Sequence, residues 1–305
     1  MQYLKSFSLA SENDEVDFML SNASYRLDMA CYSQNNAYPF HIFPKKSLKK
    51  LEFEPITIFY GNNGSGKSTV LNIIAEKLNI KRSAPFNDAP LLENYLELCS
   101  YSLERGVRSL PSESEIITSD GVFDFLLDIR AINEGIDRER QSLFEEYTET
   151  VRDSRENGWQ MRDLSEYDEL CRRMDARKKT KSQYVAKRMS AGHELPPKSN
   201  GESAYLYFTH KIKENALYIL DEPENSLSPK LQLELARFLE EAVRFYGCQL
   251  IISTHSPFLL AMRGAKIYDL DSAPASVRKW SELENVRTYY ELFSNRKNEF
   301  EGDQK

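Results

Sequence analysis

The segment Gly61–Thr69 constrains this chain more than any other. It reads Gly-Asn-Asn-Gly-Ser-Gly-Lys-Ser-Thr and satisfies the pattern G-x-x-x-x-G-K-[ST]. The β-branched and aromatic run 56–60 before it predicts a buried strand, and the run 70–78 after it predicts a helix. A glycine loop between a strand and a helix points backbone N–H groups at one spot, and the N-terminus of the helix favours an anion there. The sequence therefore predicts a phosphate-binding loop in an α/β fold.

The residue types within this loop suggest individual roles. We expect Lys67 to reach the β- and γ-phosphates of a nucleoside triphosphate and the Ser68 hydroxyl to ligate Mg²⁺. The loop residues expected to contact the nucleotide are Gly61, Asn62, Asn63, Gly64, Ser65, Gly66, Lys67, Ser68 and Thr69. A glycine-rich turn without a ligand is the alternative, and the flanking strand and helix disfavour it.

Bulk composition narrows the class of protein. The chain has 305 residues, a formal net charge of −7 at pH 7, and four widely spaced cysteines, Cys31, Cys99, Cys171 and Cys248. This spacing fits neither a disulfide framework nor a metal cluster. No signal-peptide pattern is visible, and no apolar run approaches the roughly 20 residues that a membrane helix needs. We expect a cytoplasmic protein that has no membrane partner.

Charge is distributed unevenly along the chain. Residues 113–171 carry 17 acidic and 6 basic side chains, whereas residues 172–198 carry 9 basic and 2 acidic ones. Apolar residues at roughly helical spacing also run through this region: Ile129, Ile132, Ile136, Leu143, Tyr147 and Val151. We expect a short helical arm or lid rather than a long coiled coil, since acidic residues interrupt any heptad pattern.

The regions on either side of this arm are rich in predicted strands. Their continuous apolar runs suit a parallel sheet that is covered on both faces. We therefore expect residues 1–128 to form the first half of a nucleotide-binding core, residues 129–198 a charged helical insertion, and residues 199–305 the second half with a polar C-terminal tail beginning near residue 281.

The second half contains an acidic pair, Asp221 and Glu222, directly after the apolar run 216–220. Ligands of open α/β sheets bind at the carboxyl ends of the strands, so both carboxylates are well placed. We expect Asp221 to hold Mg²⁺ directly or through water, and Glu222 to activate or orient an attacking water. The alternative is an acidic turn that only ends the strand.

A strand, a helix and a further strand follow in this half. Ser228-Pro229 predicts the start of the helix and Gly247 its end, and the run 248–253 predicts the next strand. This pattern is typical of a right-handed parallel crossover. His255 comes just after that strand, where we expect it to contact the γ-phosphate, although a lone histidine can also be purely structural.

These motifs, taken in order, resemble the ABC-type ATPases. The similarity is to the soluble SMC/RecF-like branch, which includes the overcoming-lysogenization-defect and PtuA-like ATPases of prokaryotic defence systems. The motifs are a Walker A at Gly61–Ser68, a signature-like loop at Ser199–Ser203, a Walker B at Leu217–Glu222, a D-loop-like segment at Glu224–Ser228, and an H-loop at His255. The resemblance implies an α/β fold: a P-loop NTPase with an ABC-type core, a mostly parallel central sheet, N-terminal β elements and a helical insertion.

The resemblance also implies a mechanism. Family members bind and hydrolyse ATP with Mg²⁺, so the catalytic residues here would be Lys67, Glu222 and His255. Two cores dimerise head to tail, and each signature loop closes on the ATP of the other core. In this chain the signature contacts would come from Ser199, Gly201 and Glu202, which implies an ATP-dependent homodimer or higher oligomer.

Some positions depart from the family pattern. Lys198 stands where leucine is usual, Asn200 replaces a glycine, and Ser228 stands where transporters carry an aspartate.

Two further functions are not clearly placed in the sequence. Asp120, at the polar end of the predicted strand 115–120, is a candidate for the Q-loop position. Tyr38 and Phe40 are candidates for stacking on adenine and are equally good candidates for the core.

The sequence alone does not identify the process that ATP hydrolysis would drive. The resemblance favours an ATPase that drives or gates a partner protein or DNA in antiviral defence, with an effector encoded nearby. The alternatives are the ATP-binding subunit of an ABC transporter and a module that binds ATP without turnover. The basic run 172–198 is a candidate contact for DNA or RNA, but such runs are usually solvated helix faces.

Overall fold

The computed structural model describes residues 1–21, 38–84, 89, 91–131 and 199–301. The chain divides into two compact units, one of residues 1–124 with 199–305 and the other of residues 125–198. The fold below is that of the first unit. The basic run 172–198 and the arm stripe from Ile132 onward lie outside the described residues, and so do Cys31, Cys171 and Lys198.

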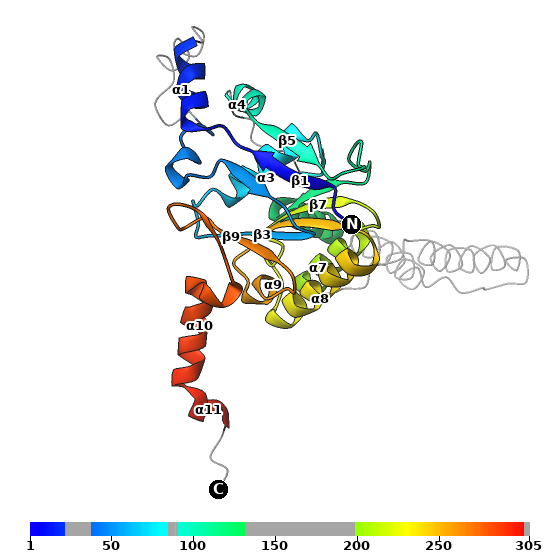
Figure 1. The fold of residues 1–305 in the computed structure, drawn as a ribbon. Helices are drawn as coiled ribbons and strands as arrows, with labels where there is room; N and C mark the ends of the chain where they lie inside the picture. The colour runs from blue at the N-terminus through cyan, green and yellow to red at the C-terminus, as the bar shows by residue number, and fades with distance from the viewer. Residues whose placement is uncertain (22–37, 85–88, 90, 132–198, 302–305) are drawn as a thin grey trace, which may run out of the picture. The chain divides into compact units, whose positions relative to one another are not determined.

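Two sheets form the β structure of this unit (Figure 1). The smaller sheet is antiparallel, with the order β2-β1-β5. The larger sheet has the order β10-β9-β3-β8-β7-β6-β4, and its pairs are parallel except β10 with β9. The strands are β1 (Leu4–Ser8), β2 (Lys50–Glu52), β3 (Ile56–Tyr60), β4 (Lys81–Arg82), β5 (Ser100–Leu103), β6 (Glu115–Thr118), β7 (Leu217–Asp221), β8 (Gln249–Ser253), β9 (Lys266–Asp269) and β10 (Ser276–Arg278). The predicted mostly parallel sheet and N-terminal β elements are confirmed.

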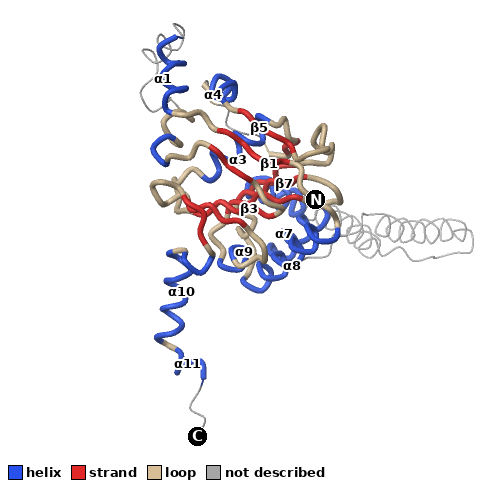
Figure 2. Tube along the Cα trace, in the orientation of Figure 1, coloured by secondary structure: helices blue, strands red, loops and turns tan. Residues whose placement is uncertain are grey.

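Helices connect and cover these strands (Figure 2). The α-helices are α1 (Glu12–Ser21), α3 (Lys67–Lys77), α4 (Leu92–Leu98), α7 (Asn200–Lys211), α8 (Pro229–Phe245), α9 (Pro257–Leu260), α10 (Glu284–Asn295) and α11 (Lys297–Glu301). Short 3₁₀ turns lie at Pro44–Lys46 and Trp280–Glu282. A further helix starts at residue 119, directly after β6, and is described as far as residue 131.

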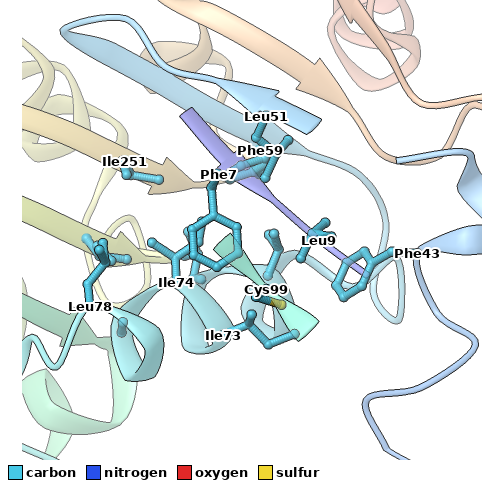
Figure 3. Packing of buried hydrophobic residues seen from close by; sticks show 14 of the residues in the cluster. Phe7, Leu9, Phe43, Leu51, Phe59, Ile73, Ile74, Leu78, Cys99 and Ile251 are labelled. Atoms are coloured by element: carbon cyan, nitrogen blue, oxygen red, sulfur yellow. The ribbon is translucent and has the colours of Figure 1, made fainter. Parts of the chain in front are cut away.

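The large sheet is buried on both faces, as its continuous apolar strands predict. On one face, Ile251 and Phe59 join a cluster with Ile73 and Ile74 of α3, and Phe7 of the small sheet belongs to the same cluster (Figure 3). Helix α3 is therefore packed between the two sheets. The alternate strand residues, such as Leu250 and Ile252, are equally buried but lie outside this cluster, on the face that α8 covers (Figure 1).

The crossover between β7 and β8 follows the sequence signals. Ser228 caps α8 by accepting a hydrogen bond from the N–H of Leu231, and Pro229 occupies the first turn. Gly247 has a φ of 67°, a backbone conformation that favours glycine, and a Cβ there would lie 2.5 Å from the Asn215 Oδ1. The two strands are parallel neighbours, as the predicted crossover requires.

The strand register places the ends of four strands side by side. Ser253 of β8 lies opposite Phe59 of β3 on one side and Asp221 of β7 on the other. Asp221 in turn lies opposite Thr118 of β6. The loops that leave these strands at their carboxyl ends therefore converge, and they include the glycine loop, the acidic pair and His255.

The C-terminal region, which was predicted as a polar tail, contains the helices α10 and α11. Leu283 and Val286 anchor the start of α10 in the core, with 1% and 7% of their surface exposed. The apolar spacing continues through Tyr290 and Phe293, which are exposed. This three-to-four-residue spacing is the signal of an amphipathic helix that the sequence analysis missed. No helix within the described ranges combines the length and apolar character needed to span a membrane.

Candidate active site

The glycine loop folds tightly between β3 and α3. Gly61 has a φ of 155° and Gly66, which precedes the first residue of α3, a φ of 93°. A Cβ at Gly61 would lie 2.6 Å from the Ser65 Oγ and 3.1 Å from Asp271 Oδ1, so no larger residue fits there. The Ser65 hydroxyl is buried and makes no hydrogen bond. The loop thus has a tightly folded backbone and a hydroxyl group that can still form a hydrogen bond, and both features suit a phosphate-binding loop.

Lys67 lies inside this loop, with only 4% of its surface exposed. Its Nζ donates hydrogen bonds to the backbone oxygens of Gly61 at 2.8 Å and Asn62 at 3.3 Å. The same atom lies 2.8 Å from His255 Nε2 and 3.7 Å from Glu222 Oε1. Within the residues that the structure describes, Glu222 is the one carboxylate recorded in an ion pair with Lys67, so this buried ammonium can bind a further anion.

Asp221 lies at the end of β7 and is linked to two hydroxyl groups. The Ser68 Oγ donates to Asp221 Oδ1 at 3.1 Å, and the Ser253 hydroxyl donates to the same oxygen. Burial raises the pKa of Asp221, while the hydrogen bonds from Ser253 and Ser68 lower it. Because the carboxylate is partly desolvated, a cation beside it would be stabilising.

Ser68 and Asp221 present the oxygen ligands that Mg²⁺ prefers. Throughout the described ranges, no group of three or more His, Cys, Asp or Glu side chains forms a possible metal site. A nucleotide-bound Mg²⁺ needs only one or two protein ligands, because phosphates and water supply the others. The hydroxyl and carboxylate present therefore fit such an ion.

Glu222 has an uncommon backbone conformation, with a φ of 49°. Its N–H donates to both the backbone oxygen and the side-chain Oγ of Ser253, each at 3.1 Å, which holds this conformation. Its Oε1 lies 3.5 Å from His255 Nε2, and its Oε2 accepts a hydrogen bond from Asn225. Strained residues of this kind cluster at functional sites. The carboxylate is placed to orient or deprotonate a water.

The signature-like segment forms the start of α7. Ser199 caps the helix by accepting from the N–H of Glu202, and the Glu202 carboxylate accepts from the N–H of Ser199, which forms a capping box. A Cβ at Gly201 would lie 3.1 Å from the backbone oxygen of Ser226, so glycine permits close contact with the D-loop-like segment. Among the described residues, no recorded hydrogen bond or ion pair joins Ser199 or Gly201 to Lys67.

The two aromatic candidates for adenine stacking differ in the structure. Phe40 is 4% exposed and packs against Phe18 and Tyr95, so it belongs to the core and cannot stack on a nucleotide. Tyr38 is half-buried beside the glycine loop. Burial raises the pKa of Tyr38, a hydrogen bond with Thr69 lowers it, and the charge of Asp221 raises it. Tyr38 therefore remains a candidate.

Asp120, the Q-loop candidate, is exposed in the first turn of the helix that starts at residue 119. The preceding strand, β6, ends at Thr118 beside Asp221 of β7. Asp120 therefore follows shortly after the carboxyl end of β6. Over the described ranges, no contact is recorded between Asp120 and the Lys67 cluster.

Several residues at the site were not identified from the sequence. Ser253 bonds to Asp221, and the Asp271 carboxylate accepts from the Asn62 N–H at 2.8 and 2.9 Å. Asn285 of α10 donates to the backbone oxygen of His255 at 2.9 Å. Glycine-loop and acidic-pair patterns do not include these positions. The amphipathic spacing of α10 was the only signal that pointed toward Asn285.

The fold and the site together define an ABC/SMC-like P-loop ATPase: a glycine loop between strand and helix, with an acidic pair and a histidine at the carboxyl ends of adjacent parallel strands. The chain belongs to the family described as "AAA domain, putative AbiEii toxin, Type IV TA system", which matches residues 94–261. The match contains the acidic pair and His255 but not the glycine loop. No curated protein matches the chain.

Solved structures show weaker likenesses. The Smc head domain of Pyrococcus furiosus, bound to the C-terminal domain of ScpA, is 13% identical with a TM-score of 0.38, over 81% of this chain and 95% of that chain. The ATP-binding cassette MJ0796, a dimer bound to ADP and Pi, is 14% identical with a TM-score of 0.35, over 76% of this chain and 88% of that chain. These values are too low to support the assignment, which comes from the family match and the sheet topology.

Proposed function

We propose that this protein binds ATP with Mg²⁺ and hydrolyses it to ADP and phosphate. One observation carries the proposal: Lys67 Nζ, Glu222 Oε1 and His255 Nε2 lie within 2.8 to 3.7 Å of one another. They follow the three neighbouring parallel strands β3, β7 and β8, at the edge of the sheet where ligands bind. A cation, a carboxylate and an imidazole in this arrangement suit phosphoryl transfer to water.

Each side chain has a distinct role in this proposal. The glycine loop and Lys67 bind the β- and γ-phosphates. Ser68 and Asp221 would hold Mg²⁺, which when bound would offset phosphate charge. Glu222 orients a water or takes its proton as the water oxygen attacks the γ-phosphorus and the bond to the β–γ bridging oxygen breaks. His255 contacts the γ-phosphate and so keeps it in line for attack.

We infer that ATP also joins two copies of the chain head to tail. Ser199 and Asn200 are exposed at the N-terminus of α7, where the positive end of the helix dipole favours an anion. In the described part of the chain, no recorded hydrogen bond or ion pair joins Ser199 or Gly201 to the Lys67 cluster. A second copy would bring Ser199, Gly201 and Glu202 against the bound nucleotide and complete the site.

The proposed output is control of a partner by ATP-dependent closure. The family's description refers to a toxin of a type IV toxin–antitoxin system, and the resemblance to defence ATPases points in the same direction. We propose that the closed dimer gates an effector protein encoded nearby in antiviral defence. DNA or RNA is a second candidate partner.

Glu222→Gln tests hydrolysis and dimerisation together. The amide cannot act as a base, so we expect ATP binding to persist, hydrolysis to fall by on the order of a hundredfold or more, and a dimer to accumulate on a sizing column with ATP and Mg²⁺. Glu241→Gln, at an exposed position of α8, is the matched control and should behave like the wild type.

The outcomes separate the two parts of the proposal. A wild type that binds ATP without turnover would contradict hydrolysis. A Glu222→Gln protein that binds ATP and stays monomeric would contradict head-to-tail closure.

A further inference from the structure

We propose that Glu224 and Asn285 are positioning residues that hold the backbone of His255 from two sides and so fix the direction of its imidazole. The inference rests on the proposed function, because it concerns the histidine that we assign to the γ-phosphate. Neither side chain touches the reacting atoms in this proposal. Both act through the H-loop backbone.

Glu224 holds the N–H side of the H-loop. Its Oε1 accepts hydrogen bonds from the N–H of His255 at 2.6 Å and from the N–H of Ser256 at 3.2 Å. Glu224 lies in the loop after β7, whereas His255 follows β8, so this carboxylate joins two loops that are 31 residues apart. Hydrogen bonds from N–H groups to a carboxylate are stronger than those between neutral groups. One oxygen therefore fixes two consecutive N–H groups.

Asn285 holds the opposite side. Its Nδ2 donates to the backbone oxygen of His255 at 2.9 Å. Its own N–H donates to the Tyr60 hydroxyl at 3.3 Å, and Tyr60 is the last residue of β3 before the glycine loop. The Asn285 Oδ1 is buried and has no hydrogen-bond partner. The burial of this amide is thus compensated mainly through its contact with His255.

The first turn of α10 cannot easily move away from the H-loop. Leu283 and Val286, on either side of Asn285, are buried in the core. The amide nitrogen is therefore presented from a fixed helix start. Fixed helical elements position functional groups more accurately than loops do.

The two contacts together restrain the peptide unit that joins His255 to Ser256. Asn285 bonds to its C=O and Glu224 to its N–H, and Glu224 also bonds to the N–H of His255. With the backbone held, the imidazole reaches the site only through its side-chain torsions. Its Nε2 lies 2.8 Å from Lys67 Nζ in this arrangement.

Asn285→Asp is the first test. Aspartate has nearly the same shape as asparagine but no side-chain N–H, so it cannot donate to the His255 carbonyl. Displacing a positioned group by about 1 Å can cost on the order of a hundredfold in rate. We expect kcat for ATP hydrolysis to fall by roughly tenfold to a hundredfold, with KM and ATP affinity within about twofold of the wild type.

Glu224 offers a rescue experiment. Glu224→Ala removes the acceptor and should lower kcat as Asn285→Asp does. Glu224→Gln keeps one acceptor oxygen and should retain most of the activity. Thr288→Ala is the matched control: it removes a hydrogen bond to the Glu284 backbone one turn further along α10, without touching the H-loop.

A second measurement does not depend on turnover. We expect the imidazole Cε1–H signal of His255 in the NMR spectrum, assigned with His255→Ala, to shift in nucleotide-free Asn285→Asp and Glu224→Ala. The signal should stay in place in Glu224→Gln and Thr288→Ala. A wild type without ATPase activity would contradict the proposed function, yet this signal would still test the positioning. An unmoved His255 signal in both Asn285→Asp and Glu224→Ala would overturn the inference.

Discussion

Lys67 Nζ and His255 Nε2 lie 2.8 Å apart, although 188 residues separate the two side chains in the chain. The sheet explains this proximity. Phe59 of β3 lies opposite Ser253 of β8, so the two loops that leave these strands start level with each other. The lysine reaches back from the first turn of α3 and the histidine extends from the next loop. The candidate site is thus a direct consequence of strand order.

Lys67→Ala should weaken ATP binding. Hydrogen bonds to charged groups contribute about 1.5–3 kcal/mol, which corresponds to a loss of roughly ten- to a hundredfold in affinity. Titration with a fluorescent ATP analogue measures this loss. Lys5→Ala, at an exposed position of β1, removes the same charge elsewhere and should leave the affinity unchanged. Equal affinity in Lys67→Ala and the wild type would contradict the phosphate-binding role.

Asp221→Asn should abolish the contribution of Mg²⁺ to nucleotide affinity. The amide keeps an oxygen that can accept from Ser68 but loses the charge that attracts the ion. We expect similar ATP affinities for variant and wild type in EDTA, and a gain on addition of Mg²⁺ in the wild type alone. Asp17→Asn, on the exposed side of α1, should respond to Mg²⁺ as the wild type does. A full Mg²⁺ response in Asp221→Asn would argue against this ligand.

Gly201→Ala should disturb the contact between α7 and the D-loop-like segment. The added Cβ would lie 3.1 Å from the backbone oxygen of Ser226 and 3.0 Å from Leu231 Cδ1, so these neighbours would have to shift by a few tenths of an ångström. Overpacking of this kind costs about 1–3 kcal/mol of unfolding free energy. We also expect weaker ATP-dependent dimerisation on a sizing column, with ATP affinity retained.

Gly121→Ala is the control for this substitution. A Cβ at Gly121 would make only ordinary contacts of 3.6 Å or more, and the residue lies in a helix. The exchange should be neutral or stabilising by up to about 1 kcal/mol. Equal losses of dimer in both glycine variants would show that the effect is not specific to α7.

Glu224 should make the unfolding free energy depend on pH. Burial raises the pKa of Glu224 above its ordinary value, against hydrogen bonds from Thr254 and the His255 backbone that lower it. The folded state then holds the proton more tightly than the unfolded state does. This contribution to stability is fully present below the unfolded pKa and is lost as pH rises through the folded pKa.

Glu224→Gln removes this titration. As pH rises from the ordinary glutamate pKa to neutral pH, the wild type loses this contribution and the variant does not. The difference in unfolding free energy, variant minus wild type, should therefore increase over this range. Urea unfolding at a series of pH values measures the difference. A difference that stays constant or decreases with pH would contradict a raised pKa.

Local signals in the sequence predicted a large part of the fold. Continuous apolar runs predicted β3, β7 and β8, and Ser228, Pro229 and Gly247 predicted the ends of α8. These signals depend on neighbouring residues alone, so they can be interpreted without the fold. The helix α10 within the predicted polar C-terminal tail was not predicted, because its apolar spacing was overlooked. Phe40 could not be placed because stacking and core roles require the same residue type.

The sequence by itself determined the glycine loop, the acidic pair and the histidine as candidates, since each follows a recognisable strand. Only the tertiary structure decided which groups surround them. Ser253 reaches Asp221 from the adjacent strand, and Asn285 reaches the backbone of His255 from a helix near the chain's end. Such partners depend on strand order and helix packing, which bring together residues that have no local pattern in common. The distance of 2.8 Å between Lys67 and His255 has the same origin.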